Sequence, residues 1–248
     1  MISVIVPTIW KGEQIKTMLP KLLDHNKIGE VIIVDNAKNN KFFRLPKHNK
    51  LIVLEQKENI YVNPAWNVGV KHSKFDKICL MNDDIIFDIT VFDKVFKFIT
   101  LENGVIGPNG TSIKSFYMDS PYISVDPCRT FTHGFGTLLF VHKKNYLPIP
   151  NELKINFGDV WLYDYNALQY RQNYEIKNLC IKTKMGTSST NENLSPITKS
   201  DDKICCDIFS KLPYTRDGVM VSDTLIHNMI NDKENFQIRL FRKIGFID

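Results

Sequence analysis

The stretch KICLMNDD, at residues 77–84, joins a short apolar run to three polar side chains. Lys77–Met81 has the uninterrupted hydrophobic character of a strand that is buried on both faces. It ends in Asn82, Asp83 and Asp84. Buried strands of this kind are typical of parallel sheets covered by helices, which bind ligands beyond the carboxyl ends of their strands. We therefore expect an α/β fold with its functional groups at this sheet edge.

Similar apolar runs recur along the chain, and helical patterns alternate with them through the first half. This alternation predicts a mainly parallel sheet with helices on both faces. The middle of the chain is less regular, because Gly104–Ser115 is rich in Gly, Ser and Asn. The expected strands are Ile2–Val6, Val31–Val34, Leu51–Leu54, Lys77–Met81, Thr137–Val141 and Glu175–Ile181, and the expected helices are Gln14–Leu23, Pro64–His72, Thr90–Thr100 and Asp159–Tyr170.

The composition suits one large α/β domain, or one core with an appendage. The chain has 248 residues, of which 43% are hydrophobic and 24% are charged. Its net charge is +5, and the lysines are scattered, so no nucleic-acid-binding tail is indicated. A solvated basic surface explains this charge, and attraction to an anionic substrate or a membrane surface is the alternative.

The cysteines and the apolar runs bear on the cellular compartment. The five cysteines include no C-x-x-C pair, which argues against a disulfide framework or a zinc site and favours a reducing cytosol. Ile2–Val6 reads as a first strand and not as a signal peptide. No stretch of about 18 apolar residues is present, so we expect no transmembrane segment and a cytoplasmic location.

The paired carboxylates are the strongest chemical signal. Asp83 and Asp84 would repel one another at the mouth of a sheet and raise each other's pKa. A hard divalent cation relieves that repulsion and stabilises a diphosphate leaving group; a polar turn that ends the strand is the alternative. Asp35, which follows the apolar run Val31–Val34, either accepts hydrogen bonds from a base or ribose or closes its strand with an Asx turn.

Four segments, taken in order, resemble the nucleotide-binding half of GT-A fold glycosyltransferases. They resemble in particular the family 2 group, which includes rhamnosyltransferases and other bacterial surface-polysaccharide transferases. That family shows a V-S-V-I-I-P-T opening, an E-I-I-V-V-D-D/N strand, an Asn- and Gly-bearing helix, and a strand ending in a D-x-D-like motif. The corresponding pieces here are Ile2–Thr8, Glu30–Asn36, Asn63–Gly69 and Asn82–Asp84.

The resemblance implies a domain plan and roles by position. The GT-A core would be 1–190, with a nucleotide-binding half at 1–88 and an acceptor-side half at 89–190, followed by a C-terminal loop and helical extension at 191–248. The family often has Asp where this chain has Asn82, although Asn still offers an oxygen. The resemblance implies nucleoside contacts from Pro7, Thr8 and Asp35, a diphosphate or base contact from Asn67, a ribose or sugar contact from Asp83, and Mn²⁺ or Mg²⁺ binding by Asp84.

Two later segments resemble the acceptor side of the family. His133-Gly134 opens a Gly-rich segment before a strand, and residues 157–162 resemble the E-D-x-D-L start of a helix. The resemblance puts Asp159 at the catalytic-base position, which takes a proton from the acceptor hydroxyl. A helix cap is the alternative role, and Asp164 is a second candidate base. Trp161 would either stack on a sugar ring or pack in the core.

The segment at 182–189 departs from the family, because many relatives carry a metal- or diphosphate-binding His there and this chain has none. Lys184 would neutralise phosphate charge instead. Gly186–Ser200 reads as a mobile loop. The final section has amphipathic stretches that would cover the acceptor site, form a homo-oligomer contact or rest on a membrane surface.

We therefore hypothesise an inverting glycosyltransferase that moves a sugar from a UDP- or dTDP-sugar to a glycan or another hydroxyl acceptor. Nucleic acid is not an expected partner. One alternative is a non-catalytic nucleotide-binding or scaffold protein of the same fold. The other is a sugar nucleotidyltransferase, whose Gly-rich, basic loop is matched poorly by Trp10-Lys11-Gly12.

Overall fold

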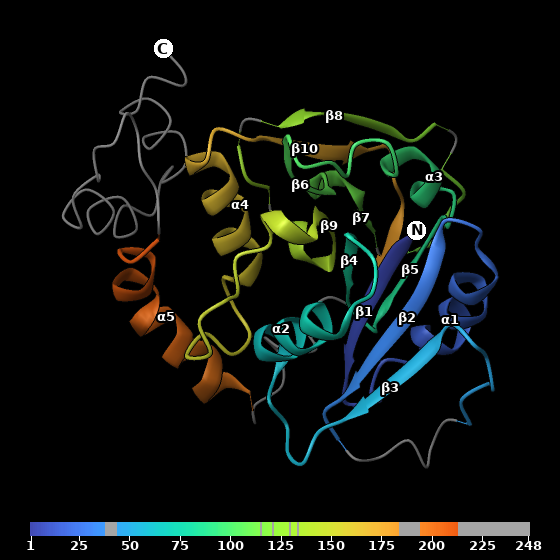
Figure 1. Ribbon diagram of the computed structural model, residues 1–248, viewed down its shortest axis with the longest axis horizontal. Coiled ribbons are helices and arrows are strands. Elements are labelled where there is room, and N and C mark those ends of the chain that lie inside the picture. Colours follow the sequence, from blue (N-terminus) through green and yellow to red (C-terminus); the bar gives the residue numbers. More distant parts are fainter. Residues whose placement is uncertain are drawn as a thin grey trace.

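The computed structural model describes residues 1–37, 44–114, 116–120, 122–128, 130–132, 134–183 and 194–212. These residues form an α/β structure around a twisted sheet with the strand order β3-β2-β1-β4-β9-β6-β10-β8 (Figure 1). A smaller sheet, in the order β5-β11-β7, lies beside it. The expected fold class, a helix-covered α/β sheet, is confirmed.

The first half of the large sheet is the parallel unit that the apolar runs predict. Strands β1 (Ile2–Thr8), β2 (Ile28–Asp35), β3 (Leu51–Glu55) and β4 (Lys77–Met81) run in one direction. The residues of β1 and nearly all of those of β2 are buried, because helices cover both faces of these strands. Their carboxyl ends therefore meet at one sheet edge.

The second half of the sheet mixes directions. Strand β9 (Leu138–His142) is antiparallel to both β4 and β6 (Asn103–Pro108), so β6 points the same way as β4. Strand β10 (Gln172–Lys177) is parallel to β6, and β8 (Ser124–Cys128) pairs antiparallel to β10. The segment expected to be irregular contains the buried strand β6 instead. Its glycines let other side chains pack closely against the strand: a Cβ at Gly107 would overlap the Phe135 ring.

The helices divide between the two faces. Helices α1 (Gln14–Asp24) and α3 (Val91–Val95) pack in one core, whereas α2 (Val62–His72) and α4 (Gly158–Leu168) pack in the other. Helix α5 (Ser195–Phe209) lies outside α2 and α4 (Figure 1). It overlaps the end of the expected loop at 186–200, so that expectation is wrong for residues 195–200. Helix α3 is also shorter than the expected Thr90–Thr100.

The small sheet lies next to the paired carboxylates. Strand β5 (Ile85–Phe87) begins directly after Asp84 and pairs antiparallel to β11 (Ile181–Thr183), which also pairs with β7 (Ile113–Lys114). Short 3₁₀ helices punctuate the connections: η2 (Gly110–Ser112), η3 (Phe135–Thr137) and η4 (Lys143–Asn145). Among the described residues, no helix combines the length and apolar character needed to cross a bilayer.

Candidate active site

The carboxyl ends of β1, β2 and β4 bring three of the expected site residues together. Thr8 and Asp35 are register partners on adjacent strands. The Thr8 hydroxyl donates a hydrogen bond of 2.5 Å to Oδ2 of Asp83, which lies just beyond β4. Pro7, the residue before Thr8, is part of the same buried strand. The tertiary structure thus joins segments that are up to 75 residues apart in sequence.

Asp83 lies in a crowded and charged position. Burial raises the pKa of Asp83 from 3.8 to about 6, the charge of Asp84 adds to this rise, and the hydrogen bond from Thr8 opposes it. Gly12 leaves the room that this arrangement needs, since a Cβ there would lie 2.7 Å from the carbonyl oxygen of Asp83. A bound cation would favour the ionised form of Asp83.

Asp35 keeps one carboxylate oxygen available. Its side chain is fully buried, and Oδ1 accepts a hydrogen bond of 2.9 Å from the backbone N–H of Ala37. Within the described structure, Oδ2 has no hydrogen-bond partner, and neither does Oδ1 of the neighbouring Asn36. Buried acceptors without partners are uncommon and costly, and these two lie side by side at the end of β2.

Asp159 lies in the first turn of α4, and backbone groups hold its carboxylate in place. Oδ2 accepts a 2.9 Å hydrogen bond from the N–H of Gly136, and Oδ1 accepts a 3.0 Å bond from the N–H of Val160. A Cβ at position 136 would lie 2.7 Å from Oδ2, so only glycine allows this approach. The side chain of Asp159 remains partly exposed.

Helix η3 links Asp159 to the paired carboxylates. Gly136 donates to Asp159, and the next residue, Thr137, accepts a 3.1 Å hydrogen bond from the N–H of Asn82. Two consecutive residues of η3 therefore contact the first residue after β4 and the first turn of α4. Gly134, another expected acceptor-side residue, stands before η3 with a φ of 84°.

Asp164 differs from Asp159 in its surroundings. It is 1% exposed, and among the described residues neither of its carboxylate oxygens has a hydrogen-bond partner. Burial raises its pKa well above the usual range, and the charge of Asp159 adds to this effect. Asp164 is therefore shielded from a substrate, whereas Asp159 is partly exposed.

Two other expected residues are engaged within the protein. The Asn67 side chain donates 2.7 Å to the carbonyl of Ile149, and its oxygen accepts from the Tyr146 hydroxyl and the Ile149 N–H. These bonds fasten α2 to the segment after β9. Trp161 is 4% exposed and packs edge-on against Phe209 of α5, so it fills the core and is not available to stack on a sugar. His133 and Lys184 lie outside the described residues.

Metal ligands are few in the described part of the chain, where no group of three or more His, Cys, Asp or Glu side chains is placed to hold an ion. Asp83 and Asp84 are adjacent carboxylates, and the charge of Asp84 helps to raise the pKa of Asp83. Mg²⁺ and Mn²⁺ are commonly held by one or two carboxylates together with substrate phosphates and waters. The donor set here fits a cation of that type.

Asp201 and Asn63 have structural roles that no motif in the sequence predicts. Asp201, on α5, is fully buried and accepts hydrogen bonds of 2.8–3.0 Å from the backbone N–H groups of residues 154–156. Asn63, on α2, donates 2.9 Å to the Asn156 carbonyl. Together they hold the segment that leads into α4 and Asp159. A charged residue on the buried face of an amphipathic helix was the only sequence signal for this role.

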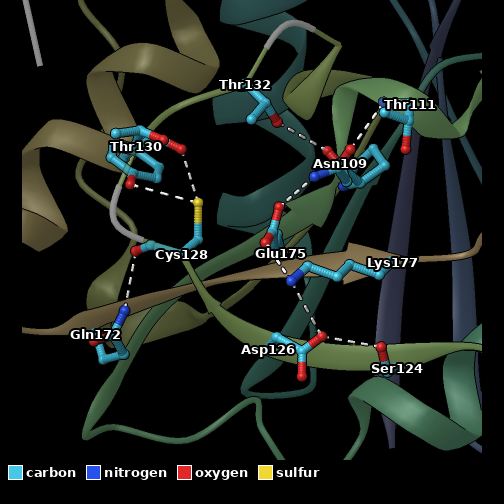
Figure 2. Close-up of polar contacts among 12 residues, drawn as sticks. Asn109, Thr111, Ser124, Asp126, Cys128, Thr130, Thr132, Gln172, Glu175 and Lys177 are labelled. Atoms are coloured by element: carbon cyan, nitrogen blue, oxygen red, sulfur yellow. Dashed lines mark hydrogen bonds and ion pairs between the residues drawn. The ribbon is translucent and has the colours of Figure 1, made fainter.

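A separate polar cluster occupies the far end of the same sheet edge (Figure 2). Lys177 on β10 lies 3.0 Å from Glu175 and 3.6 Å from Asp126 on β8, and Asn109 donates to Glu175. Ser124 in turn donates 3.0 Å to Asp126. Lys177 is shared between the two carboxylates, so this cluster fastens β8 to β10.

Comparison with solved structures identifies the fold. The chain matches S. aureus TarS 1–349 with a TM-score of 0.58 and 15% identity, over 99% of this chain and 74% of that one. It matches TarS 1–349 in complex with UDP-GlcNAc with a TM-score of 0.59, 14% identity and the same coverage. A structure of GalNAc-T7 with UDP, GalNAc and Mn²⁺ matches with a TM-score of 0.59 and 10% identity, over 97% of this chain and 57% of that one.

These neighbours are GT-A glycosyltransferases, so the chain has a GT-A-like fold. The resemblance stated from sequence is thereby confirmed for the fold. No protein-family profile matches the chain. No curated protein sequence matches it either.

Proposed function

We propose that this protein is a glycosyltransferase that moves a sugar from a nucleoside-diphosphate sugar to a hydroxyl group of a glycan or similar acceptor. The observation that carries the proposal is the link through η3. Its residues Gly136 and Thr137 bind Asp159 on one side and the end of β4 at Asn82 on the other. A candidate base and a candidate diphosphate site are thus fastened to the same short helix.

The donor would lie along the sheet edge formed by β1, β2 and β4. The free Oδ2 of Asp35 is suited to accept a hydrogen bond from a nucleobase or a ribose hydroxyl. Asp83, fixed by Thr8, would face the ribose or sugar, and Asp84 would hold Mn²⁺ or Mg²⁺. When bound, the cation would offset the negative charge that develops on the departing diphosphate.

Asp159 would act as the general base. Its two backbone hydrogen bonds orient the carboxylate, so that it can accept the proton of the acceptor hydroxyl. The acceptor oxygen would then form a bond to the anomeric carbon while the bond from that carbon to the diphosphate oxygen breaks. A direct displacement of this kind inverts the anomeric configuration.

The solved neighbours support a UDP-linked donor as the first to test. TarS has been crystallised with UDP-GlcNAc and with UDP, and GalNAc-T7 with UDP, GalNAc and Mn²⁺. A dTDP-sugar is the second candidate, because the same sheet edge would receive either pyrimidine. The sugar and the acceptor are open choices for a substrate screen.

A nucleotide-binding screen tests the proposal. Thermal shift and calorimetry would compare UDP, dTDP, GDP and CMP, each with Mn²⁺, with Mg²⁺ and with chelator. We expect one pyrimidine diphosphate to raise the melting temperature, since a ligand that binds only the folded state stabilises it. We expect Asp84→Asn to reduce this effect in the presence of metal, and an exposed control, Asp207→Asn, to leave it unchanged.

Two other outcomes would redirect the interpretation. Nucleotide binding without hydrolysis or transfer of any nucleotide-sugar would favour a non-catalytic binding protein of the same fold. The absence of binding to every nucleotide under every metal condition would refute the assignment of the donor site.

A further inference from the structure

The outer side of helix α2 carries a groove that the donor site does not use. This α2 groove lies between α2, the 56–61 segment after β3 and the 143–154 segment after β9, and its volume is about 970 Å³. Thr8, Asp35 and Asp83 do not line it, whereas Asn67 does, with its side-chain amide bonded to Ile149. Pockets of roughly 300–1,000 Å³ are the usual size for small-molecule sites, so the α2 groove has room for an oligosaccharide of a few rings.

The charge of the α2 groove is positive. Three lysines line it, Lys71, Lys143 and Lys154, against a single carboxylate, Glu58. None of these ammonium groups forms an ion pair with a carboxylate in the described part of the chain. Lys143 is held at the wall, because its Nζ donates 2.6 Å to the carbonyl of Ser73. Unpaired cations gathered around a concave surface attract an anionic ligand.

The remaining lining suits a sugar. The side-chain amides of Gln56, Asn59 and Asn151 offer both donors and acceptors for hydroxyl groups. Tyr61 and Pro64 provide apolar surface against which the C–H face of a sugar ring can pack. Amides, flat apolar surface and unpaired lysines together match a saccharide that carries negative charge.

The backbone of the groove is held in shape. Tyr61 has a φ of 67°, a conformation that costs a non-glycine residue about 1 kcal/mol or more and is enriched at ligand sites. Its N–H donates 2.9 Å to Asn59, and its carbonyl accepts 3.2 Å from the side chain of Asn36 at the end of β2. On the other wall, Asn67 ties α2 to Ile149.

We propose that the α2 groove binds an acidic saccharide, that is, a glycan segment bearing carboxylate or phosphate groups. Lys71 and Lys154 would contact the anionic groups, Lys143 would add positive charge, and the amides and Tyr61 would contact the sugar rings. Thr8, Asp35 and Asp83 lie outside this site, and the proposal does not depend on the proposed transfer reaction.

Calorimetry on the full chain without nucleotide tests this site with two probes of matched size, trigalacturonic acid and maltotriose. We expect the acidic trisaccharide to bind and the neutral one to bind at least about tenfold more weakly. We expect Lys71→Ala with Lys154→Ala to weaken trigalacturonate binding by roughly tenfold or more, because two charge-assisted contacts are lost. The matched control is Lys21→Ala with Lys94→Ala, which removes the same charge from α1 and α3 on the opposite side of the sheet.

Several results would overturn the proposal. If the control pair weakens trigalacturonate binding as much as the groove pair does, the attraction to a basic protein is non-specific. If maltotriose binds as tightly as trigalacturonate, the lysine charges have no role in binding. Displacement of trigalacturonate by UDP would show that the groove belongs to the donor site. Binding to inorganic phosphate or to phosphatidylglycerol vesicles that equals trigalacturonate binding, and is lost in the same double variant, would identify a simple anion or a lipid headgroup as the occupant instead.

Discussion

The hydroxyl of Thr8 donates a 2.5 Å hydrogen bond to the carboxylate of Asp83. This bond joins the end of β1 to the second residue after β4. The same Thr8 oxygen accepts a 2.8 Å bond from the N–H of Trp10. Thr8 is buried, so water cannot easily replace either bond. This contact fixes where the carboxylate points and also stabilises its ionised form.

Replacing Thr8 tests that contact. Thr8→Val keeps the shape of the side chain and removes the donor, so we expect the pKa of Asp83 to rise above about 6 and the free energy of unfolding to fall by about 1–3 kcal/mol. NMR titration of Asp83 and urea unfolding measure the two effects. Thr8→Ser keeps the hydroxyl and should retain both; an unchanged Asp83 pKa in Thr8→Val would show that the bond does not stabilise the charge.

The pKa of Asp83 predicts a pH dependence for cation binding. Its value of about 6 in the folded protein means that Asp83 loses its negative charge below pH 6. This loss weakens the attraction for a cation at the neighbouring Asp84, so Mn²⁺ affinity should rise from pH 5 to pH 7. Between pH 3.8 and about 6 and without metal, Asp83 keeps its proton in the folded state and has released it in the unfolded state. The free energy of unfolding therefore falls as pH rises through this range. Calorimetric Mn²⁺ titrations with UDP at several pH values, with Asp83→Asn as the control, measure the first effect.

Replacing Asp159 separates catalysis from donor binding. Asp159→Asn keeps the shape of the side chain but cannot take a proton, so we expect kcat to fall by roughly 10²–10⁴-fold while affinity for the nucleoside diphosphate stays within about twofold. Steady-state transfer assays and calorimetry measure the two quantities. A variant that keeps more than half of the wild-type kcat would exclude Asp159 as the base.

Asp164 should make the protein less stable at higher pH. Because burial raises its pKa in the folded state, the unfolded state releases its proton first, and stability falls as pH rises above the usual range of a carboxyl group. Asp164→Asn removes this titration, so we expect the variant to be more stable than the wild type at pH 8 by roughly 1–3 kcal/mol. Urea unfolding from pH 5 to pH 8 measures the difference, and parallel pH profiles of the two proteins would contradict the expectation.

Asp201 should affect catalysis from outside the substrate site. Its carboxylate accepts three backbone N–H groups of the segment before α4, so we expect Asp201→Ala to lower the free energy of unfolding by about 2–4 kcal/mol. At a temperature where the variant remains folded, kcat should fall while the affinity for nucleotide is retained, because Asp159 follows this segment. Asp207→Asn, an exposed change on the same helix, is the control and should alter neither quantity.

The strand runs were the most predictable part of the fold. β1, β2, β3 and β4 follow continuous apolar runs, because a strand covered on both faces must be apolar on both faces. Strand β6 was not predicted, since its glycines resemble a loop in sequence and become favourable only where Phe135 packs against them. Helix α5 was only partly recognised, because the chain before it is polar and its buried face is completed by α4 and the 154–156 segment.

The site divides in the same way. Asp35, Asp83 and Asp159 stand out in sequence because each follows a hydrophobic run or begins a helix. A carboxylate at such a position either binds a ligand or caps the end of a strand or helix. The resemblance placed Asn67 near a ligand, and the sequence left Trp161 between sugar stacking and core packing; in the structure they contact Ile149 and Phe209. The sequence shows only whether a helix face is apolar or polar. It does not show which later segment of the chain packs against that face.

The sequence by itself determined the class of fold and the edge at which its chemistry gathers, because strand periodicity and strand ends are local properties of the chain. Only the tertiary structure decided which carboxylates are exposed, which have a raised pKa and which hold other segments in place. Asp159, Asp164 and Asp201 are chemically identical in sequence, and they differ because one is held partly exposed by Gly136, one is buried without a partner and one is surrounded by backbone N–H groups. Long-range packing sets those surroundings, and a carboxylate takes its charge and its role from them.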